Sequence, residues 1–381
     1  MAKIALLGLG VVASGVPEIL AHQSGKIKQL TGNVPTISKA LVYNEAEAAA
    51  KADVAEKYGI DLVLDIAEVT GDAEIDIVVE LIGRIDTARD FITQALNAGK
   101  HVVTANKDLL ATYGSELKEI AQKNGVNLYY EAAVAGGIPI LRTLANSLDV
   151  DCVTEVLGIL NGTTNYMLTQ MKANGVSYAE ALKEAQDLGY AESDPRNDVE
   201  GIDAGYKVAI LSDFAFGVPL TIDDIDCHGI ANVTAGHVLL ADEFGYEIKL
   251  VGRAKKVGGN VFGTVRPAFV SKRHVLSSVS NAMNAVFVYS ENVGMSMYYG
   301  PGAGSLPTAN SVVADIVKIA QNIENGVPAA PFNRYQKAGG VASKGDVKSD
   351  FYVVENHALK RLENITFAQA AEYAVAYPII D

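Results

Sequence analysis

The chain has 381 residues, 49% hydrophobic and 20% charged, so it can bury a large core and is not a disordered protein. At roughly 100–200 residues per domain, this length predicts about two domains. The net charge of −14 disfavours nucleic acid as a partner, because a phosphate backbone repels an acidic surface. No run of about 18 apolar residues occurs, so we expect no membrane partner and a cytoplasmic protein. Cys152 and Cys227 are too few for a disulfide scaffold or a cysteine-based zinc site.

Short apolar runs alternate with helical patterns in the first third of the sequence. The apolar runs occupy residues 3–7, 36–43, 75–82, 101–104 and 126–130, and the helical patterns occupy 45–58, 86–98 and 109–123. Strands separated by helices of this length indicate right-handed βαβ units and a parallel sheet. We therefore predict an α/β protein in which residues 1–133 form a Rossmann-type domain.

The pattern changes from residue 134 onward. Helical patterns at 177–188 and 198–216 precede strand-like runs at 249–257, 261–271, 285–291 and 294–299, which short turns join into hairpins. Hairpins indicate an antiparallel or mixed sheet, so residues 134–301 predict an α+β domain with a mixed, largely antiparallel sheet. An amphipathic helix follows at about 308–323, and residues 324–381 read as a less regular C-terminal tail.

A glycine-rich turn follows the first predicted strand and opens a helix. Its sequence fits G-x-G-x-x-G/A and consists of Gly8, Leu9, Gly10, Val11, Val12 and Ala13. The glycines permit a tight turn and let backbone N–H groups approach a pyrophosphate at the helix N-terminus. This context predicts dinucleotide binding, although a simple glycine turn would give the same short match.

The end of the second predicted strand should meet the adenosine ribose. The residues there are Tyr43, Asn44 and Glu45, with no arginine to hold a 2′-phosphate. Glu45 could accept a hydrogen bond from a 2′-hydroxyl, which favours NAD over NADP. The alternative is that Glu45 is only a first-turn acid of the next helix.

Two lysines stand in places where chemistry can occur. Lys107 follows Thr104 at the carboxyl end of a buried strand, where ligands bind in open α/β sheets, or it is a solvated side chain. Lys207 lies four residues after Asp203 on one face of a largely apolar helix. This pair is either a surface ion pair or a proton-transferring lysine oriented by a carboxylate.

Two polar loops complete the set of candidates. The loop 189–195 carries Glu192 and Asp194, which could hold a substrate ammonium or simply form a turn before Pro195. The run 161–166, which begins Asn161-Gly162-Thr163, could contact a ligand, but capping of the next helix is the simpler interpretation.

Taken in order, these segments resemble homoserine dehydrogenases over about residues 1–325. The resemblance implies reversible NAD(P)-dependent conversion of L-aspartate 4-semialdehyde and L-homoserine, a step in threonine and methionine biosynthesis. It also implies a catalytic and dimerisation role for the second domain, and a homodimer or larger homo-oligomer. A returning helix at about 302–323 would complete the first domain.

The resemblance also implies roles for single residues. Lys207 would be the general acid, Asp203 would position it, and Lys107 would lie between nicotinamide and substrate. The substrate would be bound by Glu192, Asn161, Gly162, Thr163 and Asp198. Further cofactor contacts would come from Ile82, Gly83, Thr104 and Gly302. A monovalent cation, Na⁺ or K⁺, would be held by Glu131, Val134, Gly136 and Ile138, since oxygen ligands suit such ions.

The sequence departs from the family pattern in four places. Ala13 replaces the third glycine of the turn, Gly83-Arg84 replaces a glycine pair, and the second strand is not followed by arginine. A complete regulatory domain of the ACT type does not fit after a possible first strand at 348–354.

Other functions remain open at this point. Aspartate-semialdehyde dehydrogenases need a thiolate nucleophile, and neither Cys152 nor Cys227 has a convincing setting for one. Other Rossmann dehydrogenases, such as those of sugars, and a non-catalytic dinucleotide sensor are further alternatives.

Overall fold

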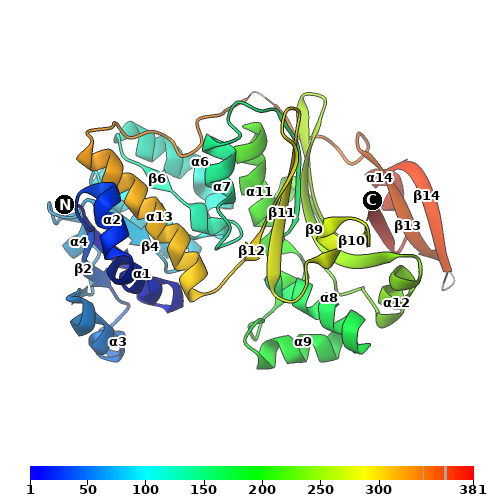
Figure 1. Cartoon of the computed structure of the whole chain (residues 1–381), viewed down its shortest axis with the longest axis horizontal. Helices are drawn as coiled ribbons and strands as arrows, with labels where there is room; N and C mark the ends of the chain where they lie inside the picture. The colour runs from blue at the N-terminus through cyan, green and yellow to red at the C-terminus, as the bar shows by residue number, and fades with distance from the viewer. Residues whose placement is uncertain (338, 356–357) are drawn as a thin grey trace. The chain divides into compact units, whose positions relative to one another are not determined.

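The structure is a computed structural model that describes residues 1–337, 339–355 and 358–381. The chain divides into two compact units (Figure 1). Unit 1 comprises Met1–Arg142 and Ala303–Arg334, and unit 2 comprises Thr143–Gly302 and Tyr335–Asp381. The first boundary between the units therefore falls after Arg142, within helix α7 (Ile140–Asn146), nine residues later than the boundary after residue 133 expected from the sequence.

Unit 1 is built on a parallel sheet of six strands within the described residues, in the order β3-β2-β1-β4-β5-β6. The strands are β1 (Lys3–Leu7), β2 (Thr36–Leu41), β3 (Asp61–Val63), β4 (Ile77–Glu80), β5 (His101–Thr104) and β6 (Leu128–Tyr129). β4 is buried along its whole length, as expected for a strand covered on both faces. Because all pairs are parallel, the loops that follow β1, β2, β4 and β5 gather at one edge of the sheet.

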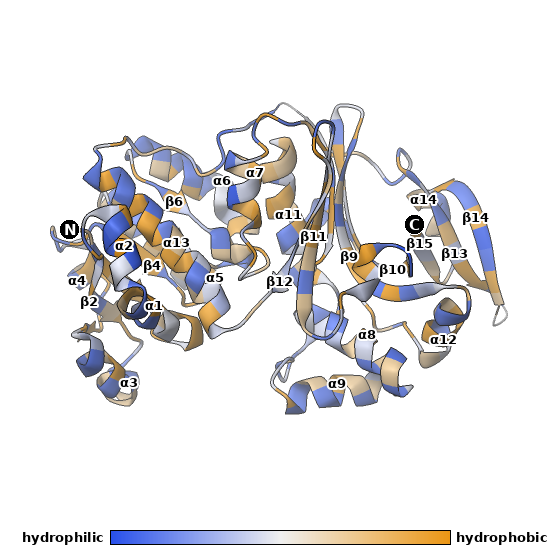
Figure 2. Cartoon of the chain, in the orientation of Figure 1, coloured by the Kyte–Doolittle hydropathy of each residue, from blue (hydrophilic) through white to orange (hydrophobic). Residues whose placement is uncertain are grey.

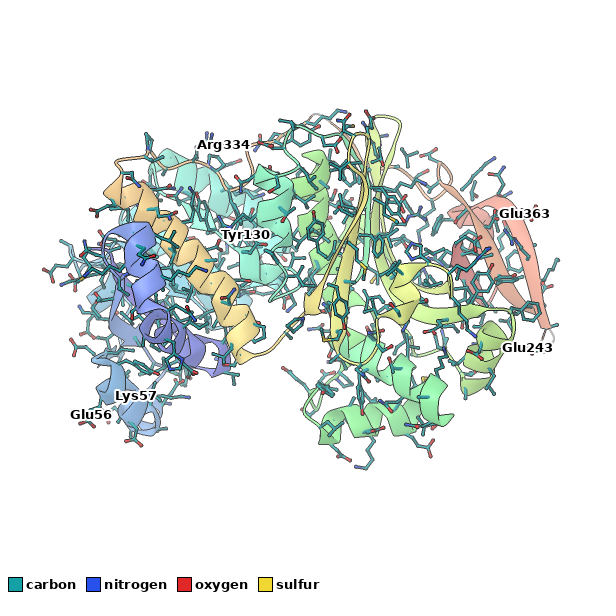
Figure 3. All side chains as sticks on the ribbon, in the orientation of Figure 1. Glu56, Lys57, Tyr130, Glu243, Arg334 and Glu363 are labelled. Carbon is teal, nitrogen blue, oxygen red and sulfur yellow. The ribbon has the colours of Figure 1, made fainter. Side chains whose placement is uncertain are left out.

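The helices of unit 1 connect and cover this sheet. They are α1 (Val11–His22), α2 (Ser24–Thr31), α3 (Glu45–Tyr58), α4 (Ala67–Thr70), α5 (Ile85–Asn97), α6 (Lys107–Lys123) and α13 (Ser305–Glu324). α13 alternates hydrophobic and hydrophilic positions and returns to unit 1 late in the chain, where it packs against α1 (Figure 2). Figure 3 shows Tyr130 inside this unit, where its ring meets the edge of Phe332.

Unit 2 contains a mixed sheet of nine strands within the described residues. The order is β12-β11-β7-β9-β10-β15-β13-β14, and β8 also pairs with β10. The strands are β7 (Val153–Ile159), β8 (Ile225–Cys227), β9 (Tyr246–Val257), β10 (Asn260–Ser271), β11 (Met283–Ser290), β12 (Gly294–Pro301), β13 (Lys348–Glu355), β14 (Ala358–Thr366) and β15 (Ala376–Ile380). Both expected hairpins, β9–β10 and β11–β12, are present and antiparallel. The prediction of a mixed α/β fold is therefore confirmed.

The helices of unit 2 are α8 (Gly162–Asn174), α9 (Tyr178–Asp187), α10 (Arg196–Val199), α11 (Ile202–Phe216), α12 (Ala235–Glu243) and α14 (Phe367–Ala370). The single helix expected at 198–216 is wrong. Gly201 has a φ of 82° and separates α10 from α11. A Cβ atom on Gly201 would lie 3.0 Å from Val265, so close packing against β10 also requires glycine there.

The segment expected as an irregular tail differs most from the sequence-based picture. Residues 335–381 belong to unit 2, and β15 pairs with β10 in parallel. Phe351 and Val353 of β13 are fully buried, Tyr352 between them is also buried, and Phe351 belongs to a hydrophobic cluster with Phe262 and Phe367. Residues 338, 356 and 357 of the expected tail lie outside the described residues.

The contact between α1 and α13 yields a matched pair of stability tests. A Cβ atom on Gly15 would lie 2.9 Å from Cβ of Ala309, whereas one on Gly25 of α2 would meet no atom within 4 Å. Both substitutions to alanine gain helix propensity of about 1 kcal/mol. We expect Gly15→Ala nevertheless to lower the free energy of unfolding, because overpacking costs about 1–3 kcal/mol.

Urea unfolding followed by circular dichroism measures both variants. Gly25→Ala should be as stable as the unsubstituted protein or more stable. Equal stabilisation of the two variants would show that α1 and α13 do not pack as closely as described.

Candidate functional site

The glycine turn after β1 leaves backbone donors open at the start of α1. Gly8 has a φ of 89°, and its N–H is already donated to the carbonyl oxygen of Leu41. Gly10 caps α1 without a side-chain hydrogen bond, and a Cβ atom there would meet no atom within 4 Å. The first-turn N–H groups of Val11, Val12 and Ala13 have no partner within the helix. This cradle therefore fits a dinucleotide pyrophosphate.

The corner after β2 is held by a reciprocal cap. The Asn44 side chain accepts the N–H of Glu47, and Glu47 accepts the N–H of Tyr43. These bonds fix the start of α3, where Glu45 is exposed in the first turn. The side chain of Tyr43 is 80% exposed, which is unusual for a large ring beside a strand end.

Glu80 ties two of the edge loops together, and the sequence analysis missed it. Glu80 is fully buried at the end of β4, where Oε1 accepts the N–H groups of Ile82 at 2.7 Å and Gly83 at 3.2 Å. Oε2 accepts the Thr104 hydroxyl at 2.5 Å. Burial raises the pKa of Glu80, and these hydrogen bonds oppose that shift. The detectable signal was a carboxylate inside an otherwise apolar strand.

The same network positions the start of α6. Thr104 Oγ1 accepts the N–H of Asn106, whose side chain accepts the N–H of Leu109 as a helix cap. The cap places Lys107 in the first turn of α6, two residues earlier than the predicted helix start, with Nζ 3.3 Å from Asp108 Oδ1. Candidate residues Ile82, Gly83 and Thr104 thus all donate to one buried carboxylate, and Lys107 follows in the helix that Thr104 and Asn106 cap.

Unit 2 buries a lysine on α11. Lys207 and Asp203 are each 8% exposed, with Nζ of the lysine 2.7 Å from Oδ2 of the aspartate. Lys207 Nζ also donates to the carbonyl oxygen of Leu160, just after β7, at 2.6 Å. The interpretation as a surface ion pair is therefore wrong, because both side chains lie inside the unit.

Asn161 joins this pair to a second carboxylate. Its Nδ2 donates to Asp198 at 2.6 Å and to Asp203 at 2.8 Å, while its Oδ1 accepts the N–H of Thr164. The expected capping of α8 is thus confirmed. Burial raises the pKa of Asp198, and the charge of Asp203 adds to that rise. The structure brings together Asn161, Asp198, Asp203 and Lys207.

The other candidate residues of unit 2 lie in different settings. Thr163 donates to the carbonyl oxygen of Tyr190, and Gly162 is required because a Cβ atom would lie 2.8 Å from the Ala282 carbonyl oxygen. Glu192 is exposed in its loop and makes no side-chain bond to the lysine cluster. Gly302 packs on Asn284, whose amide would lie 2.1 Å from an added Cβ atom.

The candidate cation loop of unit 1 uses its carboxylate for another purpose. Glu131 Oε1 and Oε2 accept the N–H groups of Leu141 and Arg142 at the start of α7. Burial raises the pKa of Glu131 to about 7 and that of Asp315, which accepts the Glu131 N–H, to about 6. Each carboxylate oxygen of Glu131 thus already accepts one backbone N–H group. No cluster of three or more His, Cys, Asp or Glu suited to a metal occurs among the residues described.

Two family models match the chain. One, described as the NAD binding domain of homoserine dehydrogenase, matches residues 8–131, and one described as homoserine dehydrogenase matches residues 139–317. The homoserine dehydrogenase of Lactococcus lactis subsp. lactis (strain IL1403) is 49% identical over 350 residues, which cover 92% of this chain and 81% of that protein. The chain belongs to the homoserine dehydrogenase family.

Solved structures of homoserine dehydrogenases agree with this assignment. The enzyme from Thiobacillus denitrificans matches with a TM-score of 0.87 and 39% identity, covering 92% of this chain and 81% of that one. A hyperthermophilic archaeal homoserine dehydrogenase in complex with NADPH matches with a TM-score of 0.70 and 27% identity, covering 84% and 97%. The chain is thus an NAD(P)-dependent oxidoreductase that interconverts L-homoserine and L-aspartate 4-semialdehyde in threonine and methionine biosynthesis.

Membership of the homoserine dehydrogenase family sets the alternative functions aside. The thiol of Cys227 agrees with this outcome, because burial raises its pKa to about 11, which disfavours a thiolate nucleophile. Within the described residues, no helix is both long and apolar enough to cross a membrane.

The buried carboxylate of Glu80 offers a test of how this homoserine dehydrogenase holds its cofactor loops. In Glu80→Gln, an amide replaces one acceptor oxygen, so one of three donors loses its partner at a cost of about 1–3 kcal/mol. We expect a lower free energy of unfolding and a raised KM for the dinucleotide, with a smaller change in kcat. Glu119→Gln, an exposed change on α6, is the control. An unchanged KM in a destabilised Glu80→Gln would contradict the positioning role.

Proposed function

We propose that Lys207 is the general acid and base of this homoserine dehydrogenase. The observation that carries the proposal is the buried ammonium held between Asp203 at 2.7 Å and the Leu160 carbonyl oxygen at 2.6 Å. A lysine has three N–H donors, so these two bonds leave one for a substrate oxygen. The fixed direction of that donor is what proton transfer requires.

Each residue of the cluster has a distinct task in this proposal. Bound NAD(P) supplies the hydride acceptor or donor. Lys207 protonates the carbonyl oxygen of aspartate semialdehyde as negative charge develops there, and accepts the hydroxyl proton of homoserine in the reverse direction. Asp203 balances the ammonium charge and orients it. Asn161 holds Asp198 and Asp203 in place, so the two carboxylates do not move apart.

We assign the remaining substrate contacts from the order of the motifs along the chain. Glu192 binds the substrate ammonium in this proposal, since it is an exposed carboxylate on the loop before α10. Lys107 contacts nicotinamide and substrate from the start of α6. In this proposal Gly162 and Thr163 also bind the substrate, and Gly302 contacts the cofactor.

The cofactor is held by unit 1 in this proposal. The pyrophosphate binds the open N–H groups at the start of α1, and Ile82, Gly83 and Thr104 border it from the loops that Glu80 fixes. Two observations bear on the choice of dinucleotide. Glu45 supports NAD through a 2′-hydroxyl, whereas the NADPH complex of the archaeal relative supports NADP.

A monovalent cation and an oligomer complete the proposal. Oxygen atoms of Glu131 and the carbonyl oxygens of Val134, Gly136 and Ile138 would hold Na⁺ or K⁺, supported by the left-handed Ala135 that bends this loop. The Gly136 carbonyl oxygen already accepts Ser311 Oγ, which leaves one lone pair for the ion. A homodimer or larger assembly is supported by the sheet edge β12, which exposes Met295 and Tyr299. We place the enzyme in the cytoplasm with its pathway.

Lys207→Ala tests the central assignment. Loss of a general acid lowers kcat by about 10²–10⁴-fold. We expect this loss in oxidation of homoserine, followed as absorbance of the reduced cofactor, while cofactor binding measured by fluorescence is retained.

A matched control exists in the same unit. Lys183 and Asp187 form an i,i+4 pair of the same length, 2.7 Å, on the exposed surface of α9. Lys183→Ala should leave kcat unchanged, because that pair is solvated. A kcat for Lys207→Ala within a few-fold of the unsubstituted enzyme would remove Lys207 from the mechanism.

A further inference from the structure

An arginine and a tyrosine meet at the carboxyl edge of the sheet in unit 1. Arg84 lies at the end of the loop after β4, immediately before α5, and its guanidinium carbon is 5.7 Å from the ring centroid of Tyr43. Tyr43 lies two residues after β2 and is 80% exposed. The stack therefore spans the loops of two strands that flank β1, the strand that leads into the glycine turn.

The guanidinium of Arg84 has no other task in the part of the chain that the structure describes. It makes no ion pair or hydrogen bond there, and it does not cap α5. Arg89, one turn into the same helix, is different: it stacks on Tyr113 at 4.0 Å and also bonds Glu116 at 2.6 Å. Arg84 thus presents a fork of N–H donors to solvent, held in place by an aromatic face.

The position of Arg84 indicates which part of a bound dinucleotide its N–H donors would meet. In a sheet of this strand order, the loop that follows β2 faces the 2′ position of the adenosine ribose. Tyr43 lies in that loop, and Glu47 is already bonded to the N–H of Tyr43. Glu45 is the remaining acid in the first turn of α3, so the corner holds one carboxylate and one guanidinium. A guanidinium fork matches a phosphate bidentately, whereas a ribose hydroxyl gains little from it.

We propose that Arg84, stacked on Tyr43, binds the 2′-phosphate of NADP, so that this chain uses NADP although its second strand is not followed by arginine. The inference rests on the proposed cofactor role of unit 1 and reverses the preference for NAD suggested by Glu45. The arginine comes from the loop after β4, on the other side of β1 from the loop that carries Tyr43.

Binding of two fragments tests the proposal without relying on turnover. Isothermal titration calorimetry compares adenosine 2′,5′-bisphosphate with 5′-AMP on the full chain and on Arg84→Ala. A charged hydrogen-bond pair to a phosphate is worth about tenfold or more in affinity. We expect Arg84→Ala to weaken the bisphosphate by about tenfold or more and 5′-AMP by less than about twofold. KM for NADP should rise by the same factor, with KM for NAD unchanged.

Arg89→Ala is the matched control, since it removes a second guanidinium stacked on tyrosine from the same helix. It should alter neither fragment's affinity, and thermal unfolding checks that both variants fold. Equal weakening of both fragments by Arg84→Ala would overturn the proposal, because it would show contact with adenine alone. The proposal would also be overturned if the unsubstituted chain bound 5′-AMP as tightly as adenosine 2′,5′-bisphosphate. Selective loss of the bisphosphate without any homoserine turnover would uphold Arg84 and refute the proposed catalytic roles instead.

Discussion

A buried charge must find a partner, and this constraint organises the functional parts of both units. The ammonium of Lys207 is fixed by one carboxylate and one carbonyl oxygen, and Asn161 then binds that carboxylate to a second one. Removing any one of these groups would leave another polar group unpaired inside the unit, which is costly. The chemistry and the packing of the region after β7 are therefore inseparable.

In unit 1, buried carboxylates rather than a buried lysine must find hydrogen-bond partners. Glu80 is fully buried and accepts three hydrogen bonds, so the loops after β4 and β5 are held relative to each other. Glu131 does the same for the start of α7. Arg84 is the contrasting case: it is exposed, lacks these restraints and rests only on an aromatic ring. A side chain with unused N–H donors at the edge of the sheet where ligands bind is a candidate for ligand binding. A side chain whose donors and acceptors are all used within the protein is a candidate for stabilising the fold.

Much of the fold could be predicted from the sequence because hydrophobic periodicity is a local property. The alternation of strands and helices in unit 1 and the two hairpins of unit 2 follow from it directly. The break at Gly201 could not be predicted, because glycine inside a helical pattern is often tolerated and the cause here is packing against β10. In the C-terminal segment, the possible strand at 348–354 corresponds to β13, but β14 and β15 were missed. β15 pairs with β10, which lies about a hundred residues earlier in the chain, so no local pattern indicates that pairing. Spacing alone indicated Asp203 and Lys207, but Glu80 and the Arg84 stack depend on loops that only the folded sheet brings together.

The return of α13 to unit 1 has a consequence for how the chain acquires its shape during synthesis. The first 142 residues leave the ribosome with α1 lacking the helix that covers it, and the bare surface around Gly15 persists until residues near 324 have emerged. Residues 143–302 of unit 2 are synthesised during that interval. Synthesis of the dinucleotide-binding unit therefore starts first but ends late. A chain interrupted between residues 143 and 302 lacks α13 and carries an unprotected apolar face on α1 that chaperones would have to shield.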